Sequence, residues 1–385
     1  MYNSIIKRSL LILAAIPVVV VLLEIGIRLA VPQPLDDVLF NDIYTETYSP
    51  SLNANVGSLS PGMTRSKSGQ KFRINLDGNR DYEYPIKKKD GVKRIAIVGS
   101  SVSFGYDLAL EETFGKQLEV MLRRDSPKVE NEVLLFGRPV FKAKETYARL
   151  VDRIFDYDPD LIIYSFVQNN YEGQSVDTYY SRIYNLSEIM RTGDSPGSKS
   201  LLRKVRDQWG GLKNNSMLRY IRTNFHLYLF SANSIARVLR ELSPIEKEKA
   251  QNIDVFYPET PEFMRKIKNT ETWLSLMEQE SHQRGIKFSI LFHPYEMQVN
   301  QAGLEKWQSE GIPLSEDVLS FQTHQIMKTF SDSSRIHFID ILPTLQMGIG
   351  DDEYFLEGDY GHYTASAHKL IATHLSRAIP EILSN

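Results

Sequence analysis

The sequence predicts an α/β fold, a three-layer α/β/α sandwich around a five-stranded parallel sheet. Two observations predict it. Five short apolar runs, of the kind that form strands buried on both faces, recur along the 385-residue chain. Segments with apolar residues at helical spacing follow most of these runs. Since a parallel sheet needs helices on both of its faces, this alternation favours the sandwich.

The first three expected strands are rich in Ile, Val, Leu and Phe: RIAIV at 94–98, EVLLF at 132–136 and DLIIYSF at 160–166. Glycine, which often marks the end of an element, follows the first two. The helix after the first strand has apolar residues at 114, 118, 121 and 122. The helix after the second has a complete stripe from 147 to 155, so both segments show the i, i+3, i+4 spacing of an amphipathic helix.

The alternation pauses after the third strand and then resumes. Residues from about 171 to 260 contain no strand run of comparable strength, and we expect a helical insertion there. A helix is expected around 261–284, strands at 287–292 and 336–342, and a last helix from near Thr364. Pro, Ser, Asn and Gly punctuate short extended pieces over 32–90, which predicts an irregular extension before an α/β domain at 91–385.

The insertion contains a basic stretch. Between 188 and 222 there are eight Lys and Arg residues against three acidic ones. Such a stretch is typical of a solvated helical face, and a contact with anionic lipid headgroups or an acidic glycan is the alternative.

The N-terminal segment is the most apolar part of the chain. Leu10 to Leu23 contains no charge, and within the segment 9–31 the 22 residues from Leu10 to Val31 would span about 33 Å as a helix, enough to cross a bilayer. Glu24 and Arg28 are four residues apart and can pair. We expect an uncleaved transmembrane anchor; a cleaved signal peptide and a buried core helix remain alternatives. The basic leader 1–8 would then lie in the cytosol, with the rest facing outward.

Composition excludes several kinds of chemistry. The chain has 45 Lys and Arg against 48 Asp and Glu, a net charge of −3, which argues against a nucleic-acid coat. It contains no cysteine, so thiol catalysis, disulfides, Cys-ligated zinc and iron–sulfur clusters are excluded.

Functional groups in parallel α/β sheets gather beyond the carboxyl ends of the strands. Ser101 follows the first strand, Gly137 the second, and Asn169 the third. A serine on a tight strand-to-helix turn can act as a nucleophile or simply cap the helix. Gly137 and Asn169 can offer hydrogen bonds to the same space, although both are also common turn residues.

A histidine near the C-terminus can complete this set. Asp359 and His362 are three residues apart, so the carboxylate can hold one imidazole nitrogen while the other faces Ser101. His293, just after the fourth strand, is a competing base or a substrate contact, and Asn170 is a second candidate for substrate binding.

The set resembles the SGNH, or GDSL-type, hydrolases. Their Ser, Gly, Asn and Asp-x-x-His blocks occur in the order seen here, and the segment 75–80 (NLDGNR) looks like the N-x-x-G-x-R segment of membrane-anchored bacterial members. Four positions depart from the family: Ser100 replaces the Asp of Gly-Asp-Ser, Val140 replaces the second Gly of the second block, and Val167 and Asn170 replace the Gly and the Asp of Gly-x-Asn-Asp. The resemblance covers roughly 70–170 and 286–380.

The resemblance implies a flavodoxin-like sheet and a serine esterase without a metal or organic cofactor. Ser101 would attack, His362 would act as base and Asp359 would orient it, while Ser101, Gly137 and Asn169 form the oxyanion hole. The implied substrate is an acylated carbohydrate, with acetyl as the expected acyl group, or another small ester. Together with the expected anchor, this predicts a single-pass protein of the bacterial inner membrane whose catalytic domain faces the periplasm or the cell exterior. Hydrolysis and acyl transfer with a membrane partner both fit, and a silent glycan-binding or scaffold protein is the alternative.

Overall fold

The structure is a computed structural model. It describes residues 2–31, 44–45, 48–49, 54–55, 58–59, 62–65, 71–139, 141–173, 225–227, 230–231, 234, 260–312, 314–320, 322–347 and 353–384. The chain divides into two compact units: Met1–Ile43, Arg65–Gly69 and Ser195–Ala250 form one, and Tyr44–Thr64, Gln70–Asp194 and Gln251–Asn385 form the other.

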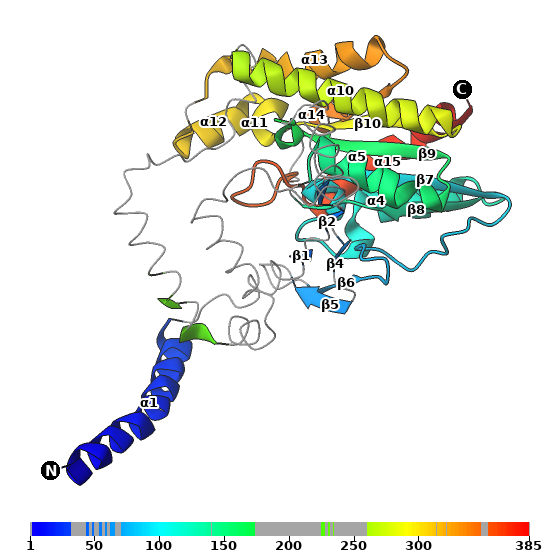
Figure 1. Ribbon diagram of the computed structural model, residues 1–385. Helices are drawn as coiled ribbons and strands as arrows, with labels where there is room; N and C mark the ends of the chain where they lie inside the picture. Colours follow the sequence, from blue (N-terminus) through cyan, green and yellow to red (C-terminus); the bar gives the residue numbers. More distant parts are fainter. Residues whose placement is uncertain are drawn as a thin grey trace, which may run out of the picture. The chain divides into compact units, whose positions relative to one another are not determined.

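The second unit contains a five-stranded sheet. Its strands are β7 (Val92–Gly99), β8 (Glu130–Leu135), β9 (Leu161–Val167), β10 (Lys287–His293) and β11 (His337–Asp340). They pair in the order β11-β10-β9-β7-β8, and every pairing is parallel. In Figure 1 the strands β10, β9, β7 and β8 follow one another in this order. The predicted five-stranded parallel sheet is confirmed, with the flavodoxin-like order 2-1-3-4-5.

Helices cover both faces of this sheet. They are α3 (Ser101–Phe104), α4 (Phe114–Asp125), α5 (Ala143–Asp152), α10 (Pro261–Gln283), α11 (Glu296–Val299), α12 (Gln301–Ser309), α13 (Gln322–Asp332), α14 (Leu342–Met347) and α15 (Ala365–Ser384). Short 3-10 turns are η1 (Leu110–Glu112), η2 (Ile154–Tyr157), η3 (Gln168–Asn170) and η5 (Glu316–Ser320). One layer pairs α4 with α15, and α10 packs on α5 and β10.

The ends of these elements follow local chemistry. The Thr260 side chain accepts a hydrogen bond from the Phe263 N–H, and Pro261 occupies the first helical position of α10. The second predicted helical stripe divides, because α5 ends at Asp152 and η2 continues from Ile154. The last strand is shorter than predicted, since the Asp340 carboxylate accepts the Leu342 N–H and α14 begins there.

Short strands precede the sheet. β1 (Tyr44–Thr45) pairs with β4 (Ser58–Leu59), β2 (Tyr48–Ser49) with β3 (Ala54–Asn55), and β5 (Gly62–Arg65) with β6 (Lys71–Ile74). Within the extension expected over 32–90, the segment 71–90 belongs to the same compact unit as the sheet.

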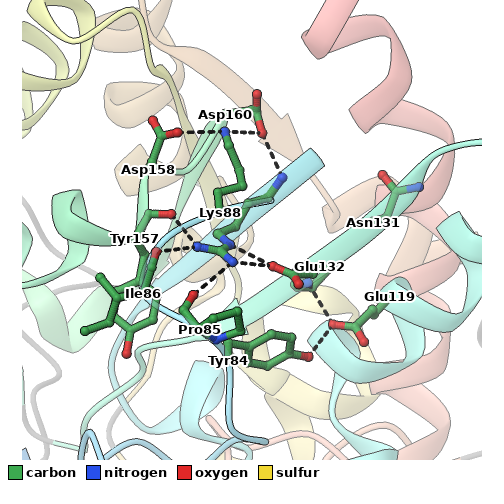
Figure 2. Close-up of polar contacts among 12 residues, drawn as sticks. Tyr84, Pro85, Ile86, Lys88, Glu119, Asn131, Glu132, Tyr157, Asp158 and Asp160 are labelled. Carbon is green, nitrogen blue, oxygen red and sulfur yellow. Dashed lines mark hydrogen bonds and ion pairs between the residues drawn. The ribbon is translucent and has the colours of Figure 1, made fainter. Parts of the chain in front are cut away.

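Buried charge attaches this segment to the sheet. Arg94 on β7 is fully buried, pairs with Glu132 and donates to the carbonyl oxygens of Pro85 and Ile86. Figure 2 shows Lys88 reaching Asp158 and Asp160, with Nζ–O distances of 3.3 and 3.1 Å.

The helix α1 (Tyr2–Ala30) belongs to the first unit. The predicted pair forms, with Arg28 Nε 2.6 Å from Glu24 Oε1, and Glu24 also accepts the N–H groups of His226 and Leu227. The transmembrane span expected at 9–31 is not supported, because the described part of the chain has no helix long and apolar enough to cross a membrane. The basic stretch at 188–222 and nearly all of the insertion lie outside the described residues.

Candidate active site

The candidate nucleophile lies on a tight turn between β7 and α3. Gly99 ends the strand with φ of 139°, and a Cβ there would lie 2.5 Å from the carbonyl oxygen of Ser165 on β9. Only glycine fits this conformation and this gap without strain. Ser101 is the first residue of α3 and is partly exposed, whereas the next three residues are buried. The turn therefore places the Ser101 side chain at the carboxyl end of the sheet, between β7 and β9, where the strand order reverses.

Ser101, His362 and Asp359 form a continuous chain of hydrogen bonds. The Nε2 atom of His362 lies 2.7 Å from Ser101 Oγ, and Nδ1 lies 2.5 Å from Asp359 Oδ2. A carboxylate can only accept, so Nδ1 carries the proton and Nε2 is left to accept the proton of the serine. The three residues that the sequence predicted as a triad are brought together in the geometry that base-assisted attack requires.

The Asp359 carboxylate is held in place by the backbone of its own turn. Its Oδ1 accepts the backbone N–H groups of Gly361 and His362, at 2.8 and 3.0 Å. Burial by itself would raise the pKa of Asp359, but the hydrogen bonds and charge of His362 and the N–H of Gly361 hold that pKa below its usual value. Asp359 is therefore ionised at neutral pH and can stabilise a positive charge on His362.

A small pocket opens beside the triad. Its volume is about 250 Å³, and its lining residues are Ser101, Val102, Val167, Tyr295, Gly358, Asp359, Tyr360, Gly361 and His362. Tyr360 and Tyr295 meet edge to face, with ring centroids 5.0 Å apart. The pocket thus combines one apolar wall with the reacting groups.

The expected oxyanion donors are only partly described. Gly137 lies against α3, where a Cβ would be 2.5 Å from the Phe104 nitrogen and 2.6 Å from the Ser103 carbonyl carbon, so glycine is required there. Asn169 belongs to η3 directly after β9, but its side chain lies outside the described residues. Their roles as donors stay predictions, as does that of the Ser101 N–H.

Two of the expected substrate contacts are instead buried. The Asn170 side chain accepts the Val167 N–H at 2.9 Å and donates to the Phe141 carbonyl, so it joins two loops. His293 is fully buried, 2.8 Å from Ser165 Oγ, and burial lowers its pKa to about 3. Neither is placed to contact a substrate, and no described contact joins His293 to Ser101.

The departure at Ser100 leaves the triad intact. Ser100 is 1% exposed, and its hydroxyl lies 3.4 Å from Asn170 Oδ1. It therefore faces the protein interior on the side away from solvent. Val140, another of the departures, lies outside the described residues.

Sequence reasoning missed Tyr106. Its ring lies over the His362 imidazole, with centroids 4.7 Å apart and planes 32° apart. Its place five residues after Ser101 carries no spacing signal, because the contact is made across the fold. Within the described residues no group of three or more His, Asp or Glu side chains is placed to hold a metal ion.

Comparison with known proteins gives distant structural likenesses. No family model and no curated protein matches the sequence. Among solved structures, the acetyl xylan esterase AlAXEase is 10% identical, with a TM-score of 0.40 over 74% of this chain and 99% of its own. A putative lipolytic protein of the G-D-S-L family from Desulfitobacterium hafniense DCB-2 is 11% identical, with a TM-score of 0.37 over 74% and 98%. Likenesses this distant do not transfer an activity to this chain.

Proposed function

We propose that this protein is a serine esterase of the SGNH type that cleaves or transfers a short acyl group. One observation carries the proposal: His362 joins Ser101 Oγ to the Asp359 carboxylate through hydrogen bonds of 2.7 and 2.5 Å. Neither distance needs to change for proton transfer to begin.

The reaction follows from these contacts. Ser101 Oγ bonds to the ester carbonyl carbon while its proton passes to His362 Nε2, and Asp359 stabilises the resulting imidazolium. The same proton then passes to the departing alcohol oxygen, which leaves an acyl group on the serine. Water, activated by the neutral imidazole, hydrolyses this acyl-enzyme; a second alcohol in place of water gives transfer.

The pocket supports a small acyl group. The pocket beside Ser101 and His362 has a volume of about 250 Å³, and the buried side chains of Val102 and Val167 contribute to its lining. Such a space suits an acetyl group better than a long chain. Acetyl esters on a carbohydrate are the substrates we propose.

The location is proposed from the sequence. The apolar run from Leu10 to Leu23 after Lys7 and Arg8 supports an anchor in the bacterial inner membrane, with the catalytic unit outside the cytosol. Digestion of spheroplasts with a membrane-impermeant protease tests this location. Complete protection of the catalytic unit from cleavage would refute it.

Turnover of p-nitrophenyl acetate by the full chain, beside its Ser101→Ala variant, tests the activity. We expect Ser101→Ala to lose at least about 10³-fold in kcat. A fluorophosphonate probe should label the parent protein at Ser101 and leave the variant unlabelled. Equal turnover by the two proteins would refute the serine mechanism. With an acetylated glycan, mass analysis of the products in the presence of an acceptor sugar separates hydrolysis from transfer.

A further inference from the structure

Arg80 lies buried behind the turn that follows α3. Its guanidinium donates to the carbonyl oxygen of Phe104 at 2.8 Å, and also to those of Gly105 and Leu108. It lies over the rings of Phe72 and Phe104, 5.0 and 5.3 Å from their centroids. Arginine has the planar fork of donors that can satisfy several carbonyls at once. The side chain thus holds together the backbone of the segment 104–108.

This segment adopts an unusual backbone conformation. Gly105 has φ of 73° and Asp107 has φ of 64°, and a residue with a Cβ is strained in this left-handed region. A Cβ at Gly105 would lie 2.3 Å from Thr113 Cγ2. Backbone strain of this kind persists only where surrounding contacts impose it. The hydrogen bonds from Arg80 to the carbonyl oxygens on both sides of Tyr106 impose this conformation.

The residue between these two positions is Tyr106. Its N–H donates to the Ser101 carbonyl oxygen at 3.2 Å, and its ring lies over His362 at 4.7 Å. Such a contact restricts rotation of the imidazole, and the face of an aromatic ring favours a nearby positive charge. The imidazolium that forms during attack is such a charge.

We propose that Arg80 and Tyr106 are positioning residues for the catalytic histidine. Arg80 holds the segment 104–108 in a conformation that is left-handed at Gly105 and Asp107, and this segment keeps the Tyr106 ring on the His362 imidazole. The imidazole is thereby kept in line with Ser101. The inference rests on the proposed function, since it assigns these residues an effect on the chemical step.

Variants of Tyr106 test the contact with the imidazole. Tyr106→Leu should lower kcat for p-nitrophenyl acetate about tenfold and change KM less than about twofold, because the ring orders the base and not the substrate. Tyr106→Phe, which keeps a ring, should restore kcat to within about threefold of the parent. Tyr82→Leu is the matched control, since Tyr82 is exposed and its hydroxyl bonds to Glu111. Equal rates for Tyr106→Leu and Tyr82→Leu would overturn the proposal.

Variants of Arg80 test whether it acts through Tyr106. Arg80→Lys keeps a charge but lacks the fork, and should also lower kcat about tenfold. In the Tyr106→Leu background the same change should cost less than about twofold more, because the ring it positions is gone. Arg73→Lys, at an exposed arginine paired with Glu83, is the control. Independent, multiplied losses in the double variant would overturn the coupling.

A proton NMR measurement needs no turnover. The proton between His362 Nδ1 and Asp359 should give a far-downfield resonance, sharp in the parent and in Tyr106→Phe and broadened or lost in Tyr106→Leu. An unchanged resonance in Tyr106→Leu would overturn the positioning role even where that variant folds poorly enough to blur its kinetics. Failure of the esterase proposal is recognised separately, by equal turnover of the parent and Ser101→Ala.

Discussion

Replacing Asp359 with asparagine separates orientation of the imidazole from stability of the loop. Asp359 Oδ1 accepts two backbone N–H groups, from Gly361 and His362, and an amide oxygen can do the same. The amide NH₂ would then face His362 Nδ1 in place of Oδ2. A donor there forces the imidazole to carry its proton on Nε2, the nitrogen that must accept the proton of Ser101.

The expected loss is therefore large in rate and small in stability. In a serine protease triad the same substitution lowers kcat about 10⁴-fold through the wrong tautomer, and we expect about 10³–10⁴-fold here. Since both backbone hydrogen bonds survive, the free energy of unfolding should change by less than about 1 kcal/mol.

Asp359→Ala is the comparison variant, because it removes the loop contacts as well. Leaving two partly buried N–H groups without an acceptor should lower the free energy of unfolding by about 2 kcal/mol. The assays are kcat for p-nitrophenyl acetate and urea unfolding at pH 7.5. An asparagine variant that retains more than about a tenth of the parent kcat, or that unfolds as easily as the alanine variant, would show that Asp359 does not act by orienting the imidazole.

Three further predictions follow from buried groups. Gly137→Ala, with a Cβ within 2.6 Å of α3, should lower kcat about 10²-fold or more as α3 shifts, measured against Gly173→Ala, where a Cβ would meet nothing within 4 Å. Burial lowers the pKa of His293 and of His368 to about 3, whereas an unfolded histidine has a pKa of about 6.5. Below pH 6.5 the unfolded chain therefore binds more protons than the folded chain. The free energy of unfolding, measured with urea, should be about 2 kcal/mol lower per histidine at pH 5 than at pH 8. Arg94→Met leaves Glu132 buried without its partner and should cost about 3–5 kcal/mol in the same assay, and a loss below about 1 kcal/mol would contradict the role of this pair.

The five strands of the sheet were predictable because strands buried on both faces must be continuously apolar. Ile95, Ile97 and Ile163 are fully buried, and their runs were visible without any knowledge of neighbours. The segment between β10 and β11 was not predicted. Its helices α12 and α13 bury few apolar side chains, Leu304 and Trp307 in the first and Met327 in the second, and the other side chains that α13 buries are polar.

The candidate site divides in the same way. Asp359 and His362 were predictable as partners because three residues of a tight turn bring their side chains together. Asn170 follows β9 and His293 ends β10, yet both side chains turn inward: Asn170 donates to the Phe141 carbonyl, and His293 lies within hydrogen-bond distance of Ser165 Oγ. Position along the chain places a residue at the edge of the sheet but does not decide which way its side chain points.

The apolar runs and the local spacing of polar residues were enough to predict the five-stranded α/β plan and the groups that can do chemistry, because strand burial and local spacing are properties of short segments. Which of those groups meet depends on tertiary packing. Ser101 and His362 are 261 residues apart in sequence, yet Ser101 Oγ lies 2.7 Å from His362 Nε2. Arg80 likewise donates to the carbonyl oxygen of Phe104, 24 residues further along the chain, at 2.8 Å. Contacts of this kind depend on how separate elements pack, and no local pattern of residues records that packing.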